Sequence, residues 1–379
     1  MDKSNLLIIV TIISLFISLL LAFFLVTVKT KHRLSNALFA VFLLLTAIDV
    51  SHPLLNLFAD GPSNFGVFRN SLAFLQIPIF YLYVLSVCYS DFKLKPKHLL
   101  HLIPFILVNV ILLPRFYSVD FASKNNFIAN GQSRIELQFN YVLFHIQVVV
   151  CFIAVFMLLR KAKKLYLENY AGTSINSYNW LFQFTTVLTI LYSFAIIKNI
   201  FKFTDYQYIS EWIKIGGLVF QMFIVCWYLF KALNNPNLFR NIDSRLKLVS
   251  DIISEEKSKM QFAENEKEYN EELSKLRNYM TAEKPFLNPS LTIQDVSQAI
   301  GIPVRELSVL INHNLGQHFY DFVNTYRIEN AMQILKDGSK SKVTILEILY
   351  DVGFNSKSSF NTAFKKHTGN TPTAYRKTL

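Results

Sequence analysis

Five polar side chains near the C-terminus have a spacing that suits contact with a regular, charged polymer. Successive members are one, three, one and three residues apart: Lys357, Ser358, Asn361, Thr362 and Lys365. On an α-helix this spacing places them on one face, because residues three and four apart are neighbours. Asn can form paired hydrogen bonds to adenine, hydroxyl groups bond bases less selectively, and Lys binds phosphates. The pattern predicts a helix face that contacts nucleic acid.

Two residues beside this face extend it toward phosphate groups. Ser356 lies at the expected N-terminal turn of the helix, where free backbone N–H groups and the helix dipole attract anions. Lys366 adds a second positive charge next to Lys365. We expect these residues to position the helix through phosphate contacts, which carry no sequence information.

A tight turn must hold that helix at the right angle. Gly353 separates two short amphipathic patterns, and a glycine there permits the sharp change of direction between two helices. A helix–turn–helix of this kind places its second helix in the DNA major groove. The apolar positions on either side of the turn are Ile345, Ile348, Leu349 and Val352 before it and Phe360 and Phe364 after it.

The same pattern occurs once earlier in the chain. In both copies an isoleucine precedes the turn glycine by eight residues: Ile293 and Gly301, then Ile345 and Gly353. Between the copies, residues 319–336 read as one long connecting helix. A rigid connector would hold two reading helices at a fixed separation, and about 34 Å would let them enter successive major grooves.

This arrangement resembles a known family. Residues 291–378 resemble the C-terminal domain of the AraC/XylS family of bacterial transcription regulators, above all in the stretch GFNSKSSFNTAFKKHTGNTPTAYRK. The resemblance implies that the helix after the turn of each repeat, which is the third helix of the family's unit, reads bases. The second of these helices would be 357–367 and the first 304–313. Carried over by position, the DNA-facing residues of the first are Arg305, Glu306, Ser308, Val309 and Asn312.

The chain departs from the family pattern in three places. Many members have Arg where this chain has Val309 and Thr362, so two charged contacts are missing. Leu349 stands where a small Ala is usual, and we expect its neighbours in the second repeat to accommodate the larger side chain.

The first 230 residues have a different composition. The whole chain of 379 residues is 52% hydrophobic, and its apolar residues are concentrated before Lys231. Seven stretches there are long enough to cross a bilayer of about 30 Å. The first is too long for a signal-peptide core and no small-x-small cleavage site follows it, so we read it as a retained anchor. The predicted spans are 5–28, 35–58, 66–89, 98–114, 137–159, 180–201 and 210–230.

The loops between these spans predict the topology. Lys and Arg gather after the first, third and fifth spans, whereas the alternate loops are poorer in both. The positive-inside rule therefore puts the N-terminus outside and the C-terminus in the cytoplasm. Together with the resemblance to bacterial regulators, this implies the inner membrane of a bacterium. Most of the net charge of +12 reflects this topology, because residues 284–379 carry only 11 Lys and Arg against 7 Asp and Glu.

A charged helical segment connects the two halves. Apolar residues recur at a spacing of 4-3-4 in two stripes, which is typical of short coiled coils. The first stripe indicates either a dimerising helix or an amphipathic helix packed on its own domain. The second we expect to pack on the domain that it precedes. The stripes are Ile242, Leu246, Val249 and Ile253, then Tyr269, Leu273, Leu276 and Met280.

Ionisable residues inside the spans are candidates for sensing a signal, because burying them in a membrane is costly. Asp49 and His52 are three residues apart in the second span, Arg69 lies in the third, and Lys198 lies in the sixth. They could line an outward-facing pocket for a small ligand, or they could simply form ion pairs. Cys88, Cys151 and Cys226 lie within apolar spans and indicate neither disulfides nor a metal cluster.

The sequence thus predicts an all-α protein. Its parts are a seven-helix transmembrane sensor domain (1–231), a helical linker (232–283) and a tandem helix–turn–helix DNA-binding domain (284–379). We expect a membrane-integral, one-component transcription regulator, not an enzyme, without cofactor or metal. The alternative is a seven-helix membrane enzyme or transporter with a regulatory DNA-binding tail, although no zinc, phosphate-loop or kinase motif is present. Expected partners are duplex DNA, the bilayer, RNA polymerase, a second copy through the linker, and an unknown small-molecule or membrane signal.

Overall fold

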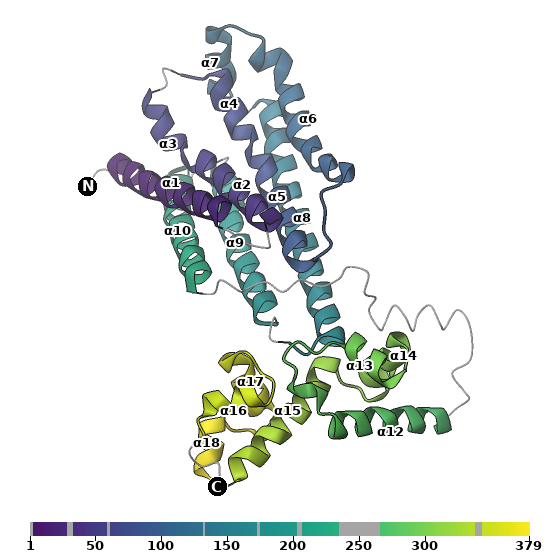
Figure 1. Cartoon of the computed structure of the whole chain (residues 1–379). Coiled ribbons are helices and arrows are strands. Elements are labelled where there is room, and N and C mark those ends of the chain that lie inside the picture. Colours follow the sequence, from purple (N-terminus) through teal and green to yellow (C-terminus); the bar gives the residue numbers. More distant parts are fainter. Residues whose placement is uncertain are drawn as a thin grey trace. The chain divides into compact units, whose positions relative to one another are not determined.

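The fold was obtained as a computed structural model that describes residues 3–28, 33–58, 61–131, 133–172, 175–202, 207–234, 266–337 and 343–379. The described residues are helical and contain no β-strand, only a single bridge between Tyr170 and Thr292. The chain divides into two compact units, labelled by element in Figure 1. The first unit is Met1–Leu159 with Trp180–Asn241, and the second is Arg160–Asn179 with Ile242–Leu379. The predicted boundaries at 231 and 283 stay predictions.

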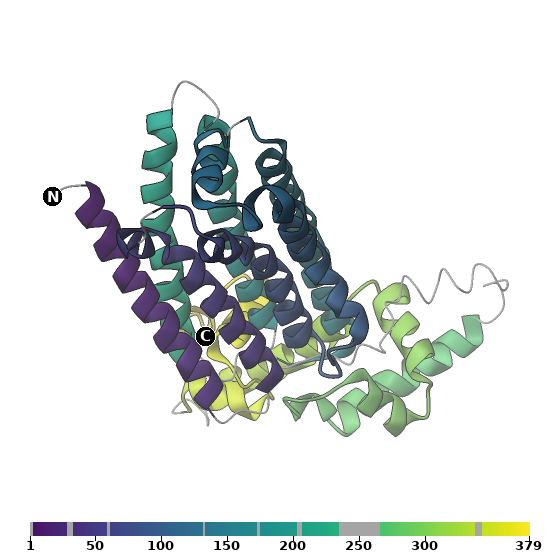
Figure 2. The same cartoon turned by 90° about the horizontal axis from the view of Figure 1, so that it is seen from above.

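Long apolar helices build the first unit. Helix α2 packs between α1 and α5, and α1 also contacts α10, so these helices run side by side (Figure 2). The helices are α1 (Lys3–Thr27), α2 (Arg33–Val50), α3 (His52–Leu55), η1 (Asn56–Phe58), α4 (Asn64–Ser71), α5 (Ala73–Cys88), η2 (Pro96–Leu102), α6 (Ile103–Leu112), η3 (Leu113–Tyr117), α7 (Phe121–Ala129), α8 (Ile135–Asn169), α9 (Ile175–Lys202) and α10 (Gln207–Asn234).

Seven helical segments among the described residues are long and apolar enough to cross a membrane. Each overlaps one of the seven predicted spans, so the prediction of seven such segments is confirmed at the level of length and composition. The segments are Asn5–Thr27, Arg33–Val50, Asn64–Cys88, Pro96–Tyr117, Ile135–Asn169, Tyr178–Phe201 and Tyr208–Tyr228.

The second span ends earlier than predicted. Helix α2 stops at Val50, and a turn at Ser51 separates it from α3. Pro53 explains the break, because its ring has no N–H for the carbonyl of Asp49 and would clash with that carbonyl in a continuous helix. The predicted extent of 35–58 was therefore wrong, and Asp49 and His52 belong to different helices.

Aromatic rings fill the interior of the first unit. Tyr228 of α10 lies against Phe39 of α2, with ring centroids 4.2 Å apart. Its hydroxyl lies 3.3 Å from that of Tyr83 in α5, so both buried hydroxyl groups have a partner. Phe184 of α9 packs against the same ring. Four helices that are distant in sequence thus share one core.

The second unit consists of shorter helices around two apolar cores. It also includes the last turns of α8 and the first residues of α9. Its own helices are α12 (Glu266–Ala282), η4 (Pro285–Leu287), α13 (Ile293–Ile300), α14 (Val304–Val309), η5 (Leu310–Asn314), α15 (Phe319–Lys336), α16 (Ile345–Asp351), α17 (Lys357–Thr368) and α18 (Pro372–Lys377).

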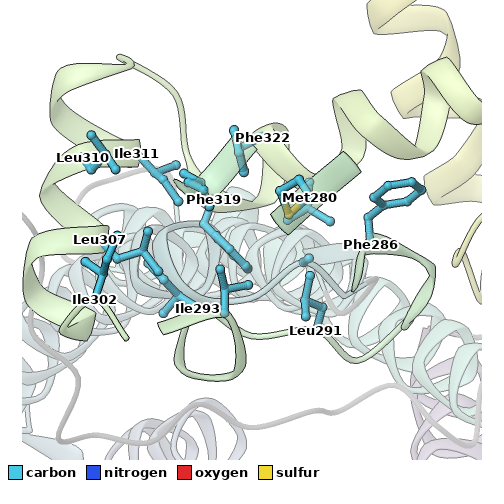
Figure 3. Close-up of a cluster of buried hydrophobic side chains, with 14 residues drawn as sticks. Met280, Phe286, Leu291, Ile293, Ile302, Leu307, Leu310, Ile311, Phe319 and Phe322 are labelled. Atoms are coloured by element: carbon cyan, nitrogen blue, oxygen red, sulfur yellow. The ribbon is translucent and has the colours of Figure 1, made fainter. Parts of the chain in front are cut away.

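The cores follow the predicted repeats. One surrounds the first repeat and draws apolar residues from η4, α13, α14 and α15 (Figure 3). The other surrounds the second repeat and includes Ile348, Phe354, Phe360 and Phe364. The predicted connector, 319–336, coincides with α15.

Helix α12 packs on the first core. Leu276 and Met280 are fully buried there, and Tyr269 and Leu273 pack against it. The expectation that the second linker stripe packs on the domain it precedes is therefore confirmed. The first stripe lies outside the described residues, so the predicted dimerising role of the linker stays a prediction.

Candidate nucleic-acid interface

The second helix pair, α16 and α17, begins with a reciprocal cap. The backbone N–H of Thr344 donates to Glu347 Oε2 at 2.6 Å, and the N–H of Glu347 donates to Thr344 Oγ1 at 3.1 Å. This capping box satisfies two N–H groups that a helix start would leave unpaired. The backbone N–H and the side-chain hydroxyl of Thr344 both hydrogen-bond to the carboxylate of Glu347, and these two bonds lower its pKa.

Gly353 makes the turn of the second pair, and only a glycine fits there. Its φ of +88° is left-handed, and a Cβ at this position would collide with the backbone carbonyl oxygen of Phe286 and lie 2.8 Å from that of Leu287. The turn thus rests directly on the backbone of η4. Close approach and backbone conformation together explain the glycine that the sequence indicated.

Helix α17 presents the predicted reading face to solvent. Lys357, Ser358, Thr362 and Lys365 are exposed, and Asn361 is partly exposed. The opposite side is anchored, because Phe360 and Phe364 are fully buried in the second core. The Thr362 hydroxyl donates to the carbonyl of Ser358 at 2.8 Å, which leaves its oxygen and methyl group for an outside partner.

The two residues predicted to hold phosphates lie at opposite ends of this helix. Ser356 is its N-cap and has extended backbone, and its side chain accepts no capping hydrogen bond. Lys366 instead pairs with Asp321 of α15 at 2.7 Å, while 69% of its side chain remains exposed. An exposed pair of this kind contributes at most about 1 kcal/mol, so a phosphate could replace the carboxylate.

The first helix pair, α13 and α14, repeats the same local plan. Thr292 and Asp295 form its capping box, with the N–H of Thr292 bonded to Asp295 Oδ2 at 2.9 Å. Gly301 ends α13 with a φ of +71°, but no atom lies within 4 Å of where its Cβ would be. The second helix differs more, because α14 has six residues and continues as the π-helical turn η5. The predicted single helix 304–313 is therefore two elements.

The predicted reading residues of α14 do not all face solvent. Arg305 and Glu306 are exposed and Val309 is partly buried, whereas Ser308 is only 4% exposed. Asn312, in η5, is fully engaged within the chain. Its amide nitrogen donates to Ser308 Oγ at 3.2 Å and to the carbonyl of Glu168 at 3.3 Å, and its oxygen accepts from Phe319 N–H at 3.1 Å.

Arg327 of α15 joins the two pairs. It is fully buried, its Nε donates to the carbonyl of Phe286 at 2.7 Å, and its Nη2 donates to that of Asn288 at 2.8 Å. Its guanidinium carbon also lies 5.4 Å from the ring centroid of Phe354, beside the turn of the second pair. Burial lowers the pKa of Arg327 to about 10, so it stays charged at neutral pH. The carbonyl of Phe286 therefore contacts both Arg327 and the Gly353 turn.

Some of these structural positions could be predicted from the sequence and others could not. Nothing in the sequence marks Arg327 as a structural centre, because its helix also carries other charged residues such as Asp321 and Glu329. The capping boxes at Thr292 and Thr344 were missed, yet the spacing Thr-x-x-acid before an apolar run is readable. Leu349, predicted to need accommodation by its neighbours, is completely buried in the second core.

The ionisable residues predicted for the membrane half gather in the first unit. Asp49 lies within electrostatic range of Arg69, Lys198 and Lys214. The same three cations act on His52. The structure therefore brings the four predicted residues into one group and adds Lys214. Arg69 is buried, and its Nη2 donates to Asn70 Oδ1 at 3.0 Å.

A polar chain and a small cavity lie in the same helix bundle. Tyr192 donates to Gln76 Oε1 at 2.7 Å, and Gln76 donates to Thr46 Oγ1 at 3.1 Å. Thr46, Tyr192 and Gln221 are among the residues that line a cavity of about 20 Å³, enough for one water molecule. Within the described ranges, no group of three His, Cys, Asp or Glu side chains could hold a metal ion.

Comparison with known proteins finds matches to the C-terminal helices. A family model described as a helix-turn-helix domain matches residues 296–378, from within α13 to the end of α18. An uncharacterized HTH-type transcriptional regulator of Staphylococcus aureus (strain COL) is 36% identical over 86 residues, which are 23% of this chain and 11% of that protein. A Streptomyces lividans protein named as an AraC-like transcription regulator is 30% identical over 88 residues, 23% of this chain and 28% of that protein. No solved structure matches significantly.

These matches define what the C-terminal region is. The chain carries a helix-turn-helix domain at its C-terminus and shares it with proteins named as transcription regulators, one of them AraC-like. The relatives bear the names of regulators and not of enzymes, in agreement with the expectation for this chain. The alignments span about a tenth to a quarter of the relatives' own lengths.

Proposed function

We propose that this protein is a membrane-integral, one-component transcription regulator that binds specific duplex DNA through two helix–turn–helix pairs. The observation that carries the proposal is the exposed polar face of α17, on a helix fixed by a buried apolar side within the matched domain. Its amide, hydroxyl and ammonium groups suit base edges and phosphates. The seven apolar helices of the same chain support the membrane location.

The two pairs would bind DNA together. In this proposal α14 and α17 enter successive major grooves on one side of the duplex, and α15 with Arg327 holds their separation. The residues assigned to DNA are Arg305, Glu306, Ser308, Val309 and Asn312 from the first pair and Ser356, Lys357, Ser358, Asn361, Thr362, Lys365 and Lys366 from the second.

The signal would reach the DNA-binding region within one polypeptide. We assign the N-terminus to the outside of the inner membrane and the C-terminal domain to the cytoplasm, as the positive-inside rule predicts. The group around Asp49, with His52, Arg69 and Lys198, is the proposed site for a small-molecule or membrane signal. Three cations around one carboxylate favour an anionic ligand. RNA polymerase and a second copy of the chain are the further partners proposed.

Genome-wide mapping of DNA bound by the intact protein tests this function. The comparison is with a Lys357→Ala/Asn361→Ala variant, which removes two reading side chains without touching the core. Lys275→Ala/Asn278→Ala is the matched control, because it removes the same side-chain types from the exposed face of α12. We expect enriched sites for the native protein and the control and their loss in the first variant. Absence of enriched sites for the native protein would exclude the regulator, and equal occupancy would exclude α17 as a reading helix.

A further inference from the structure

The second unit contains a segment that is not part of either helix pair. Residues 160–172, the last turns of α8 and the turn after it, belong to this unit and not to the first. Tyr170 forms an antiparallel bridge with Thr292, and the N–H of Ala171 donates to the carbonyl of Leu291 at 3.1 Å. The segment thus pairs by its backbone with the residues that begin the first helix pair.

Side chains reinforce this pairing. Ala171 is 1% exposed and belongs to the same apolar core as Leu291 and Ile293. Its carbonyl accepts a 2.7 Å hydrogen bond from Nη1 of Arg327. Since Arg327 is fully buried, a missing acceptor would leave part of a charged group unpaired, which costs more than an ordinary lost hydrogen bond. The segment therefore completes both the core and the hydrogen bonding of the domain.

The same segment reaches the reading side of the first pair. Glu168 lies in the last turn of α8, where backbone carbonyl groups have no partner within the helix. The amide of Asn312 donates to the carbonyl of Glu168 at 3.3 Å. Ser308, one turn earlier in α14, is 4% exposed and accepts from the same amide. Two of the side chains assigned to base contacts are thus turned toward the chain itself.

We propose that residues 160–172 form a docking segment that masks the reading face of α14, so that the first helix pair binds DNA only when the segment has left. This rests on the proposed function. A base edge needs the amide of Asn312, and in the docked form that amide is bonded to Glu168 of the segment and to the buried Ser308. Docked and DNA-bound forms of the first pair therefore exclude each other. If about 90% of molecules are docked, the apparent affinity of the first pair for DNA falls about tenfold.

Thiol labelling of the full chain in lipid nanodiscs tests docking without DNA. Cys88, Cys151 and Cys226 are replaced by Ala, and single cysteines are placed at Ser308 and, as an exposed reference, at Ser358. We expect Ser308→Cys to react with a maleimide about tenfold more slowly than Ser358→Cys. Equal rates would overturn the proposal.

A matched pair of substitutions tests whether this segment causes the masking. Ala171→Lys puts a charge beside buried Arg327 and should bring the labelling rate at Ser308→Cys close to the reference. Ala282→Lys adds the same charge at an exposed position and should leave that rate slow. Slow labelling in both variants would overturn the assignment. Ser359→Cys, 3% exposed in α17, must stay slow in both, since faster labelling there reports unfolding.

Hydrogen exchange supplies a measurement that needs no substitution. The amide of Ala171 lies outside any helix, yet its bond to Leu291 should protect it. Exchange as fast as in an open peptide would overturn docking even if Ala171→Lys failed to fold.

DNA binding tests the consequence. With a duplex recovered by the mapping experiment, full-length Ala171→Lys should bind about tenfold more tightly than Ala282→Lys. Equal or weaker binding would overturn masking. If no chain binds DNA, the proposed function fails, whereas labelling and exchange still decide whether the segment docks.

Discussion

The two helix pairs of the second unit follow one local plan and present different surfaces. Each begins with a threonine capping box and turns at a left-handed glycine. The second pair then displays a regular helix of 12 residues with an exposed polar face. In the first pair, Ser308 is buried and Asn312 bonds to the end of α8. Similar sequence patterns therefore fix similar turns, whereas contacts from distant segments decide which face remains open.

The turns differ in the same way. Gly353 presses against the carbonyl groups of η4, whereas Gly301 has open space around it. The second turn is thus part of the packing between elements, and the first is only a change of direction. If matched substitutions affected both helix pairs equally, this contrast would be contradicted. If they affected one pair more than the other, it would be supported.

The largest difference is expected at the turn glycines. Gly353→Ala should lower the free energy of unfolding of the second pair by about 3–5 kcal/mol, because backbone strain adds to a collision with η4. Gly301→Ala should cost about 1–2 kcal/mol from strain alone. Hydrogen exchange of α13, α16 and α17 amides in the full chain measures both values. Equal losses of unfolding free energy in the two variants would show that the close approach of Gly353 to η4 adds no destabilisation.

The matched asparagines should separate the two reading helices. Asn361→Ala should weaken binding to a mapped DNA site about tenfold, the effect of losing one good base contact. Asn312→Ala loses a base contact but also removes the bond that holds Glu168, so the two effects oppose each other and affinity should change little. Equilibrium titration of the full-length variants at one salt concentration is the measurement. A comparable loss for both variants would mean that the first pair already reads bases in the docked form.

The capping boxes should respond alike. Thr292→Ala and Thr344→Ala should each destabilise their own helix by about 1 kcal/mol, because each removes the acceptor for an N3 amide. Hydrogen exchange of α13 and α16 provides the comparison. If only one of the two variants were destabilised, the two helix pairs would not share the same stabilisation at the start of their first helices.

The smallest effect concerns acidity. The hydrogen bonds from Thr344 hold the pKa of Glu347 below its ordinary value of 4.5, so the carboxylate stabilises α16 above that pH. This contribution is lost as the pH falls through the lowered pKa. The melting temperature of the native chain should therefore fall more steeply below pH 4.5 than that of Glu347→Gln. If the melting temperatures of the two proteins fell in parallel with pH, the Glu347 carboxylate would not contribute to the stability of α16.

Much of the second unit could be predicted from the sequence, because its signals are local. Residues 319–336 read as one helix and form α15, and the apolar spacing around Gly353 located α16 and α17. The seven apolar segments were likewise visible by length. The break before Pro53 also has a cause that the sequence displays, namely the proline itself, but a span predicted from hydropathy alone does not take it into account.

The masking of α14 had no local signal. Ala171 and Leu291 are separated by more than a hundred residues, and nothing in either sequence environment indicates that their backbones pair. The burial of Arg327 likewise depends on carbonyl groups supplied by η4 and by the turn after α8. Contacts that join distant segments decide these positions, and a single sequence does not display them.

The buried bonds of Arg327 also limit the promoters that such a protein could use. The guanidinium ties α15 to η4, and the Gly353 turn rests on the same stretch of backbone, so neither helix pair has a hinge toward the other. One inserted base pair between two half-sites would shift them by about 3.4 Å and rotate them by roughly 35° around the duplex axis. A reader without a hinge cannot follow that rotation. Natural sites should then keep one invariant spacer length.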